Sequence, residues 1–210
     1  MNVALIGDSQ AQGAGAVLQA VLAGQGHKVT RLAQHGAGSV EVKALASKLQ
    51  GQAFDQVVVF SGSTSSAAAI KAIPAMFPGA RVVWYGSPPA TKILDLGLAK
   101  QVFGSKVTGA DYWFSSGEAA AREKRNVELP KLLPAGVQYV DWRKLAWPGG
   151  AYPAQADGIH VGKSSAAVAF APGNWPPPAG VSLQGLALPA VLVGVVLWVA
   201  HRQGWLRGFW

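Results

Sequence analysis

Two short stretches of the chain carry side chains that together could cleave an ester or amide bond. Ser9 follows the apolar residues 2–6, and Asp157 and His160 lie three positions apart much later in the chain. A serine hydroxyl becomes a nucleophile when a histidine accepts its proton, and the histidine needs a carboxylate to orient its ring. At this spacing a turn brings the Asp157 carboxylate within reach of the second ring nitrogen of His160. The sequence therefore predicts a catalytic triad of Ser9, His160 and Asp157.

The position of Ser9 supports this prediction. Residues 2–6 are typical of a short buried strand and Gly7 ends the run, so Ser9 is expected in the turn at the carboxyl end of the strand. Ligands bind at that edge of an open α/β sheet. Taken alone, Gly7, Asp8 and Ser9 are equally well explained by a plain turn, because all three residue types favour turns. The catalytic interpretation is favoured because Asp157 and His160 follow later in the chain.

Residues 7–10 and 157–160 resemble the first and last sequence blocks of the SGNH (GDSL-type) hydrolases, in the order and at the distance typical of that family. The family comprises esterases, lipases and carbohydrate deacetylases. The resemblance implies that residues 1–171 form a three-layer α/β/α, flavodoxin-like domain with a five-stranded parallel sheet. It also implies that this domain hydrolyses esters through Ser9 and needs no cofactor.

The resemblance further implies an oxyanion hole, in which N–H groups stabilise the negative charge that forms on the substrate oxygen. The backbone N–H of Ser9 is one expected donor. Residues 34–38 follow the second predicted strand and resemble the block that supplies a glycine N–H. Gly36 is the better match in this block and Gly38 is the alternative.

The third block of the family departs from its pattern in this chain. The family has Gly-x-Asn-Asp there, and the asparagine amide donates to the oxyanion, whereas residues 61–65 read Ser-Gly-Ser-Thr-Ser. The hydroxyl of Thr64, or alternatively of Ser63, is the expected substitute. Loss of one oxyanion donor costs about 10²–10³-fold in rate. The site is therefore expected to be either slower than is usual for the family or no longer catalytic.

Other residues near the nucleophile are expected to contact the substrate. Asp8 and Gln10 flank Ser9 in the chain. Residues 86–89 follow the fourth predicted strand and resemble the substrate-contacting loop of the family, which assigns Pro88 to the same role.

Two other chemistries are disfavoured by the spacing of their residues. Gly13 and Gly15 begin a Gly-x-Gly-x-x-Gly pattern, but Leu18 occupies the third glycine position, which argues against a dinucleotide site. His27 and His35 are not spaced like metal ligands, and the chain has no cysteine, so we expect no metal.

Apolar and helical stretches alternate along the chain, which is typical of a parallel sheet covered on both faces. The strand order 2-1-3-4-5 is expected, with Ser9 beside the point where the strand order reverses. Strands are predicted over residues 2–6, 28–32, 56–60, 81–85 and 136–140, and helices near 14–24, 40–50, 65–75, 117–132 and 162–170.

The composition changes after residue 171. Residues 172–180 are rich in proline and glycine and predict a stiff linker. Residues 181–200 carry no charge, and a helix of that length spans about 30 Å, the thickness of a bilayer core. The tail, residues 201–210, is basic and aromatic, as interfacial anchors are. The sequence predicts a single-pass membrane anchor, and a helix buried against a partner protein is the alternative.

The orientation of this anchor stays open. The chain starts directly with a strand and shows no signal peptide, which favours a cytoplasmic domain. The positive residues after the apolar segment favour the opposite orientation, with the tail inside and the domain outside. A phage or virion membrane is a third possibility, because it needs no ordinary secretion.

The charge of the chain favours anionic surroundings. Its formal net charge is +8, with 18 Lys and Arg against 10 Asp and Glu. The basic residues are scattered, and the densest cluster, residues 122–125, is interrupted by an acid, so no nucleic-acid motif is present. The expected partners are a lipid bilayer, an acyl-ester carbohydrate, and virion or envelope proteins.

Two functional hypotheses follow from these observations. The leading one is a membrane-tethered serine esterase that removes O-acyl groups, above all acetyl groups, from an envelope or cell-wall carbohydrate. The alternative is a structural or virion-associated membrane protein that keeps the hydrolase fold with little or no activity, as the changed third block allows.

Overall fold

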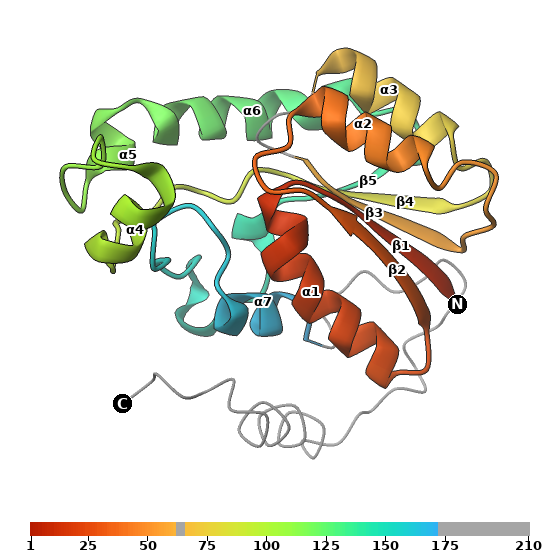
Figure 1. The fold of residues 1–210 in the computed structure, drawn as a ribbon, viewed down its shortest axis with the longest axis horizontal. Coiled ribbons are helices and arrows are strands. Elements are labelled where there is room, and N and C mark those ends of the chain that lie inside the picture. The colour runs from red at the N-terminus through yellow and green to blue at the C-terminus, as the bar shows by residue number, and fades with distance from the viewer. Residues whose placement is uncertain (62–65, 172–210) are drawn as a thin grey trace. The chain divides into compact units, whose positions relative to one another are not determined.

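The computed structural model describes residues 1–61 and 66–171, and within them a five-stranded parallel sheet forms the centre. The strand order is β2-β1-β3-β4-β5, which confirms the predicted order (Figure 1). The strands are β1 (Asn2–Gly7), β2 (Lys28–Ala33), β3 (Gln56–Phe60), β4 (Arg81–Tyr85) and β5 (Gln138–Val140). The order reverses between β1 and β3, so the carboxyl end of β1 lies where an open sheet binds ligands.

Side chains that alternate along each strand supply two separate cores. Along β1, Val3 and Leu5 belong to one core, and Ala4 and Ile6 belong to the other. This alternation is what a strand buried on both faces requires, and it explains why the strands have near-continuous apolar sequences. The two cores make the molecule three layers thick, as expected from the resemblance.

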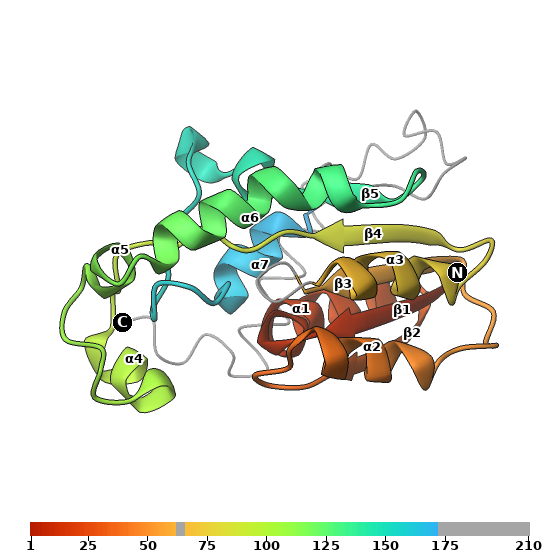
Figure 2. The ribbon, with the colours of Figure 1, turned by 90° about the horizontal axis from the view of Figure 1, so that it is seen from above.

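Five of the helices that cover the sheet are those expected from the sequence. Two of them, α1 and α7, lie on one face, whereas α2, α3 and α6 lie on the other (Figures 1 and 2). Their bounds are α1 (Ser9–Gly24), α2 (Ser39–Ser47), α3 (Ala67–Ala75), α6 (Glu118–Leu132) and α7 (Lys163–Ala169).

The expected turn at Ser9 is wrong, because Ser9 is the first residue of α1. The helix begins there, and not near residue 14, because the Asp8 side chain caps it by accepting a hydrogen bond from the Gln10 backbone N–H at 2.8 Å. Gly7 ends β1 at a close approach of two strands. A Cβ atom at Gly7 would lie 2.1 Å from the Phe60 carbonyl oxygen, so no larger residue fits.

A lobe between β4 and α6 was not predicted. It contains α4 (Leu96–Phe103) and α5 (Tyr112–Ser115), and it lies beyond the carboxyl ends of the strands (Figures 1 and 2). Two 3₁₀ turns, Trp142–Lys144 and Pro148–Gly150, follow β5 and were also not predicted. The lobe has a small core of its own, which consists of Ile93, Ala99, Val107, Trp113 and Ile159. Ile159 lies between Asp157 and His160 in the chain, so this core includes the predicted catalytic loop.

The part of the chain that the structure describes has no helix long and apolar enough to cross a membrane. The predicted linker 172–180, the apolar segment 181–200 and the tail 201–210 lie outside the described residues. Ser63 and Thr64 lie outside them as well.

Candidate active site

The structure brings Ser9, His160 and Asp157 together as a chain of two hydrogen bonds. The Ser9 Oγ lies 2.9 Å from the His160 Nε2, and the His160 Nδ1 lies 2.7 Å from the Asp157 Oδ2. The His160 side chain is 24% exposed and the Asp157 side chain is 8% exposed. A serine and an imidazole at this distance can exchange a proton, and the buried carboxylate fixes the ring that accepts it.

The loop that carries Asp157 and His160 is shaped by Asp157 itself. Its Oδ1 accepts hydrogen bonds from the backbone N–H groups of Ile159 at 3.0 Å and His160 at 2.8 Å. Gly158 adopts a φ of +84°, and a Cβ atom there would lie 2.6 Å from the Trp113 ring. Trp113 also donates from its Nε1 to the Asp157 carbonyl oxygen at 2.7 Å. Only glycine fits this turn between the carboxylate and the imidazole.

The charge of Asp157 is stabilised by the same contacts. Burial is the largest single influence on Asp157 and by itself raises its pKa, since a carboxylate loses hydration inside a protein. The hydrogen bonds from the His160 ring and from two backbone N–H groups outweigh burial, and the pKa of Asp157 is lower than its ordinary value. Asp157 is therefore ionised at neutral pH and able to orient a neutral or protonated imidazole.

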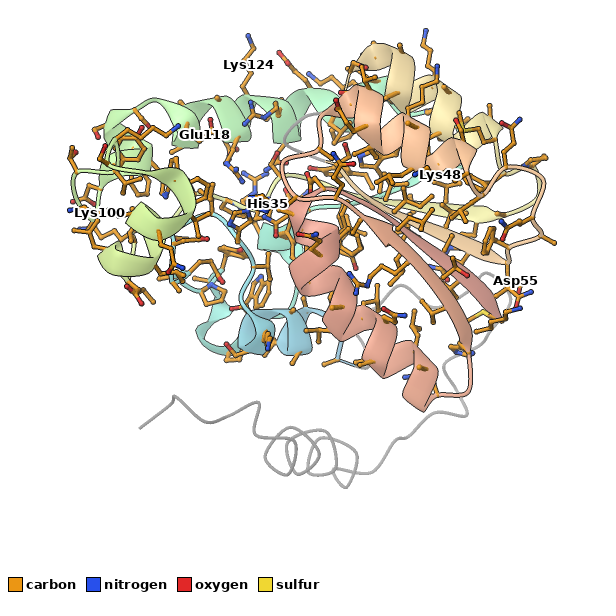
Figure 3. The ribbon with its side chains drawn as sticks, viewed as in Figure 1. His35, Lys48, Asp55, Lys100, Glu118 and Lys124 are labelled. Atoms are coloured by element: carbon orange, nitrogen blue, oxygen red, sulfur yellow. The ribbon has the colours of Figure 1, made fainter. Side chains whose placement is uncertain are left out.

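The His160 ring has aromatic neighbours on elements far away in the chain. Phe103, at the end of α4, stacks on it with ring centroids 5.5 Å apart and planes 7° apart. His35, in the loop after β2, has its ring centroid 6.3 Å from that of His160 (Figure 3). Sequence reasoning had missed Phe103, because α4 carries no signal that connects it to the triad. For His35 the sequence leaves open a place at the pocket or a solvent-exposed loop; the residue is exposed and its ring lies near that of His160.

Asp8, Gln10 and Pro88, which are predicted to contact the substrate, form buried contacts that support the site. Asp8 is 4% exposed and caps α1. Gln10 is 6% exposed, and its amide is bonded to the backbone of the His160 loop, donating to the Ile159 carbonyl and accepting from Val161 N–H. Pro88 is buried, and its carbonyl accepts a hydrogen bond from a buried arginine. All three residues are buried, and their contact with a substrate stays a prediction.

The oxyanion-hole candidates differ in what their N–H groups do. The Ser9 N–H lies at the N-terminus of α1, where the backbone N–H groups favour a nearby negative charge. Gly36 is exposed and has a φ of +68°, and its N–H forms no hydrogen bond with the described residues. The Gly38 N–H is already donated to the Glu41 Oε2 at 2.9 Å, where it caps α2. Of the two glycines, Gly36 is the one with a donor to offer.

The loop after β4 is fixed to α6 by buried polar side chains. Arg122 donates from its Nη1 to the Pro88 carbonyl at 3.1 Å and from its Nε to Glu118 at 2.8 Å. Glu118 lies at the start of α6 (Figure 3). Burial disfavours the charge of Arg122 and lowers its pKa, and Glu118 partly opposes this effect. The Asn126 side chain accepts a hydrogen bond from the Ser87 N–H and donates one to the Ser87 carbonyl oxygen, each at 2.9 Å. These contacts give the loop beside the site a rigid support.

No group of three or more His, Asp or Glu side chains within residues 1–61 and 66–171 is arranged to hold a metal ion. The contacts of Ser9, His160 and Asp157 have the geometry that nucleophilic attack by a serine requires, with the histidine as proton acceptor.

Two solved structures share this fold with the chain. The periplasmic domain of a lipopolysaccharide acetyltransferase from Salmonella ser. Paratyphi A superposes with a TM-score of 0.51 at 15% identity, covering 80% of this chain and 80% of that domain. The C-terminal catalytic domain of peptidoglycan O-acetyltransferase A from Streptococcus pneumoniae gives a TM-score of 0.50 at 20% identity, covering 80% and 87% of the two chains. No protein-family model and no curated protein matches the sequence. At these identities the likeness concerns the fold, which is the α/β fold expected from the resemblance to SGNH hydrolases.

Proposed function

We propose that the protein is a serine esterase of the SGNH type, tethered to a membrane, which removes O-acyl groups, above all acetyl groups, from an envelope or cell-wall carbohydrate. The observation that carries this proposal is the pair of contacts from Ser9 to His160 and from His160 to Asp157, at 2.9 and 2.7 Å. Ser9 lies near the start of the domain, whereas Asp157 and His160 lie near its end. If Ser9 were only part of a structural turn, nothing would require these side chains to meet.

The reaction uses these residues in two halves. The Ser9 Oγ attacks the ester carbonyl carbon while His160 Nε2 takes the hydroxyl proton, and the oxyanion is stabilised by the Ser9 and Gly36 N–H groups. The carbohydrate oxygen then leaves with the proton from His160, and the acyl group remains on Ser9. Water attacks this acyl-enzyme with His160 again as base, which releases the carboxylic acid and restores Ser9.

Carbohydrate is the favoured substrate class for two reasons. The two proteins of similar fold are described as acting on lipopolysaccharide and on peptidoglycan. The net charge of +8 attracts the chain to anionic envelope polymers.

Ester hydrolysis by the full chain in a mild detergent tests the proposal. A chromogenic acetate ester and an O-acetylated carbohydrate should both be hydrolysed, the second with release of acetate. Ser9→Ala should abolish turnover and leave the melting temperature nearly unchanged, since a half-buried serine at a helix start contributes little to the core. Absence of turnover together with failure of a fluorophosphonate to label Ser9 would favour the alternative of a structural or virion-associated protein.

Acyl transfer is a second candidate, because both proteins of similar fold are described as acetyltransferases. The same acyl-Ser9 intermediate would then be attacked by a carbohydrate hydroxyl instead of water. Hydrolysis of the chromogenic acetate in the presence of oligosaccharide acceptors separates the two activities. A transferase forms acetylated oligosaccharide at the expense of free acetate, whereas an esterase releases acetate only.

The membrane tether rests on the uncharged residues 181–200. The full chain should remain with membranes through carbonate extraction and should require detergent for solubility. Release by carbonate would instead favour a helix that binds a partner protein.

A further inference from the structure

Gln10, the residue after the nucleophile, forms hydrogen bonds with the backbone on both sides of His160. Its Nε2 donates to the Ile159 carbonyl oxygen at 3.1 Å, and its Oε1 accepts from the Val161 N–H at 3.1 Å. Ile159 and Val161 are the two neighbours of His160. The Gln10 side chain is 6% exposed, so both hydrogen bonds are shielded from water.

A primary amide is suited to this place because it carries a donor and an acceptor on one rigid plane. The two backbone groups that it binds belong to the residues on either side of His160 in the chain, and both residues are buried. A buried N–H or C=O group without a partner is destabilising, so the loop is held firmly where Gln10 binds both groups. No charged side chain supplies a neutral donor and a neutral acceptor in the same way.

The chain position of Gln10 gives these two bonds a further consequence. Ser9 and Gln10 are consecutive residues in the first turn of α1, so the backbone that carries the Ser9 hydroxyl also carries the amide. The Asp157 carboxylate orients the His160 ring within its own loop, but it has no hydrogen bond to α1 among the described residues. In addition to the Ser9–His160 contact, the two hydrogen bonds of Gln10 connect the loop of the base to the helix of the nucleophile.

We propose that Gln10 is a positioning residue that sets the distance and angle between the Ser9 Oγ and the His160 Nε2. This inference rests on the proposed function, in which that contact transfers a proton. The Gln10 amide binds the backbone beside His160 and acts through that residue. Its removal should slow the chemical step, because a displacement of about 1 Å at reacting groups can cost about 10²-fold in rate.

Gln10→Met tests this, since methionine has nearly the same length and volume and leaves no cavity. We expect kcat for a chromogenic acetate ester to fall about 10- to 100-fold with KM nearly unchanged. Gln155→Met is the matched control. Gln155 is 2% exposed and its amide binds the Pro153 carbonyl at 2.7 Å, the Gly162 N–H at 2.8 Å and the Ser165 hydroxyl at 3.2 Å; it has no hydrogen bond to α1 among the described residues. It should lower the melting temperature with a much smaller effect on kcat. Equal losses of kcat in both variants would overturn the inference.

A double-mutant cycle with His160→Ala separates positioning from general damage. If Gln10 acts through His160, Gln10→Met should change the residual rate of His160→Ala by less than about twofold, because the group it positions is gone. The residual rate is measured with an activated phenyl ester at high enzyme concentration. A further loss as large as in the wild-type background would show that Gln10 supports the fold in general.

The ¹⁵N NMR signals of the His160 ring give a readout that needs no turnover. Gln10→Met should shift or broaden both ring signals, because the ring then samples other positions, whereas Gln155→Met should leave them in place. An inactive wild-type protein would refute the proposed function, but an unchanged ring spectrum in Gln10→Met would refute the role of Gln10. The two failures are therefore distinguishable.

Discussion

At the scale of single residues, the catalytic loop combines a buried carboxylate, an obligatory glycine and a half-buried imidazole. Asp157 both shapes the turn and orients the ring, through three hydrogen bonds of 2.7 to 3.0 Å. The same atoms therefore serve stability and chemistry. Substitutions in this loop should affect both, but to different extents.

Asp157→Asn should lower kcat strongly, by about 10⁴-fold if the loss resembles that in other serine triads, because an amide favours the wrong ring tautomer. The stability effect should depend on pH. The pKa of Asp157 is lowered in the folded protein, so its ionised form stabilises the fold above the unfolded-state pKa, about 3.9. This contribution disappears as pH falls through the lower folded-state value.

Urea unfolding of wild-type protein and Asp157→Asn between pH 7 and pH 3 measures this effect. The difference in the free energy of unfolding should be largest at neutral pH and should narrow toward pH 3. Asp95→Asn is the comparison variant. Asp95 is an exposed helix cap whose Oδ1 accepts a hydrogen bond from the Leu98 N–H at 2.9 Å. A difference that stays constant with pH would contradict the assignment of a stabilised carboxylate to Asp157.

Gly158→Ala should destabilise the fold more than a positive φ alone requires. An alanine at φ +84° costs about 1–2 kcal/mol, and its Cβ would also meet the Trp113 ring at 2.6 Å. Gly150→Ala is the control, because Gly150 has a φ of +77° with no atom within 4 Å of its Cβ position. Chemical denaturation should show the larger loss for Gly158→Ala, and ester hydrolysis should fall in that variant only. Similar losses of stability would mean that Trp113 moves aside freely.

At the scale of elements, the lobe between β4 and α6 acts as a support for the catalytic loop. The Thr91 N–H donates to the Gly158 carbonyl at 2.8 Å, and Trp113 donates to the Asp157 carbonyl at 2.7 Å. Phe103 from the same lobe stacks on the His160 ring. The loop is thus fixed on one side by the lobe and on the other by Gln10 from α1.

Trp113→Phe tests the support at this scale, because it removes the indole donor and keeps an aromatic ring. We expect kcat to fall by about tenfold or more through displacement of Asp157. Trp147→Phe is the control: Trp147 is equally buried and donates to the Trp142 carbonyl at 2.6 Å, away from the triad. It should lower the melting temperature with little change in kcat. An unchanged kcat in Trp113→Phe would contradict the inference that the lobe supports the position of Asp157.

At the scale of the whole molecule, the charge and the apolar segment 181–200 both favour work at a surface. Under the proposed function, a net charge of +8 would attract an anionic envelope polymer toward the protein. Long-range attraction of this kind is screened by salt, since the Debye length falls from about 8 Å at 0.15 M to about 3 Å at 1 M.

Salt should therefore distinguish polymeric from small substrates. The kcat/KM for an acetylated anionic polysaccharide should fall as ionic strength rises, whereas the value for a small neutral acetate ester should stay nearly constant. Parallel assays from 0.05 to about 1 M sodium chloride check this. Equal salt dependence for both substrates would argue that the charge of the chain plays no part in substrate capture.

The sequence by itself determined the sheet, its strand order and the three side chains of the triad. Residues 2–6, 56–60 and 81–85 are apolar runs bounded by turn residues, and such local patterns survive folding because each strand is buried on both faces. The triad followed from residue types whose chemistry requires one another, Ser9, His160 and Asp157. The order of the blocks placed them at the same edge of the sheet.

Only the tertiary structure decided how that edge is built. The roles of Asp8 and Gln10 depend on which backbone groups meet them, and for Gln10 these groups lie about 150 residues further along the chain. In α4 only Ala99 is fully buried, and Phe103 at its end reaches His160 through a contact between segments far apart in the chain, which no local pattern indicates. Side-chain types and local patterns specify which elements form, whereas the partner of a buried amide or ring is chosen by packing between distant segments.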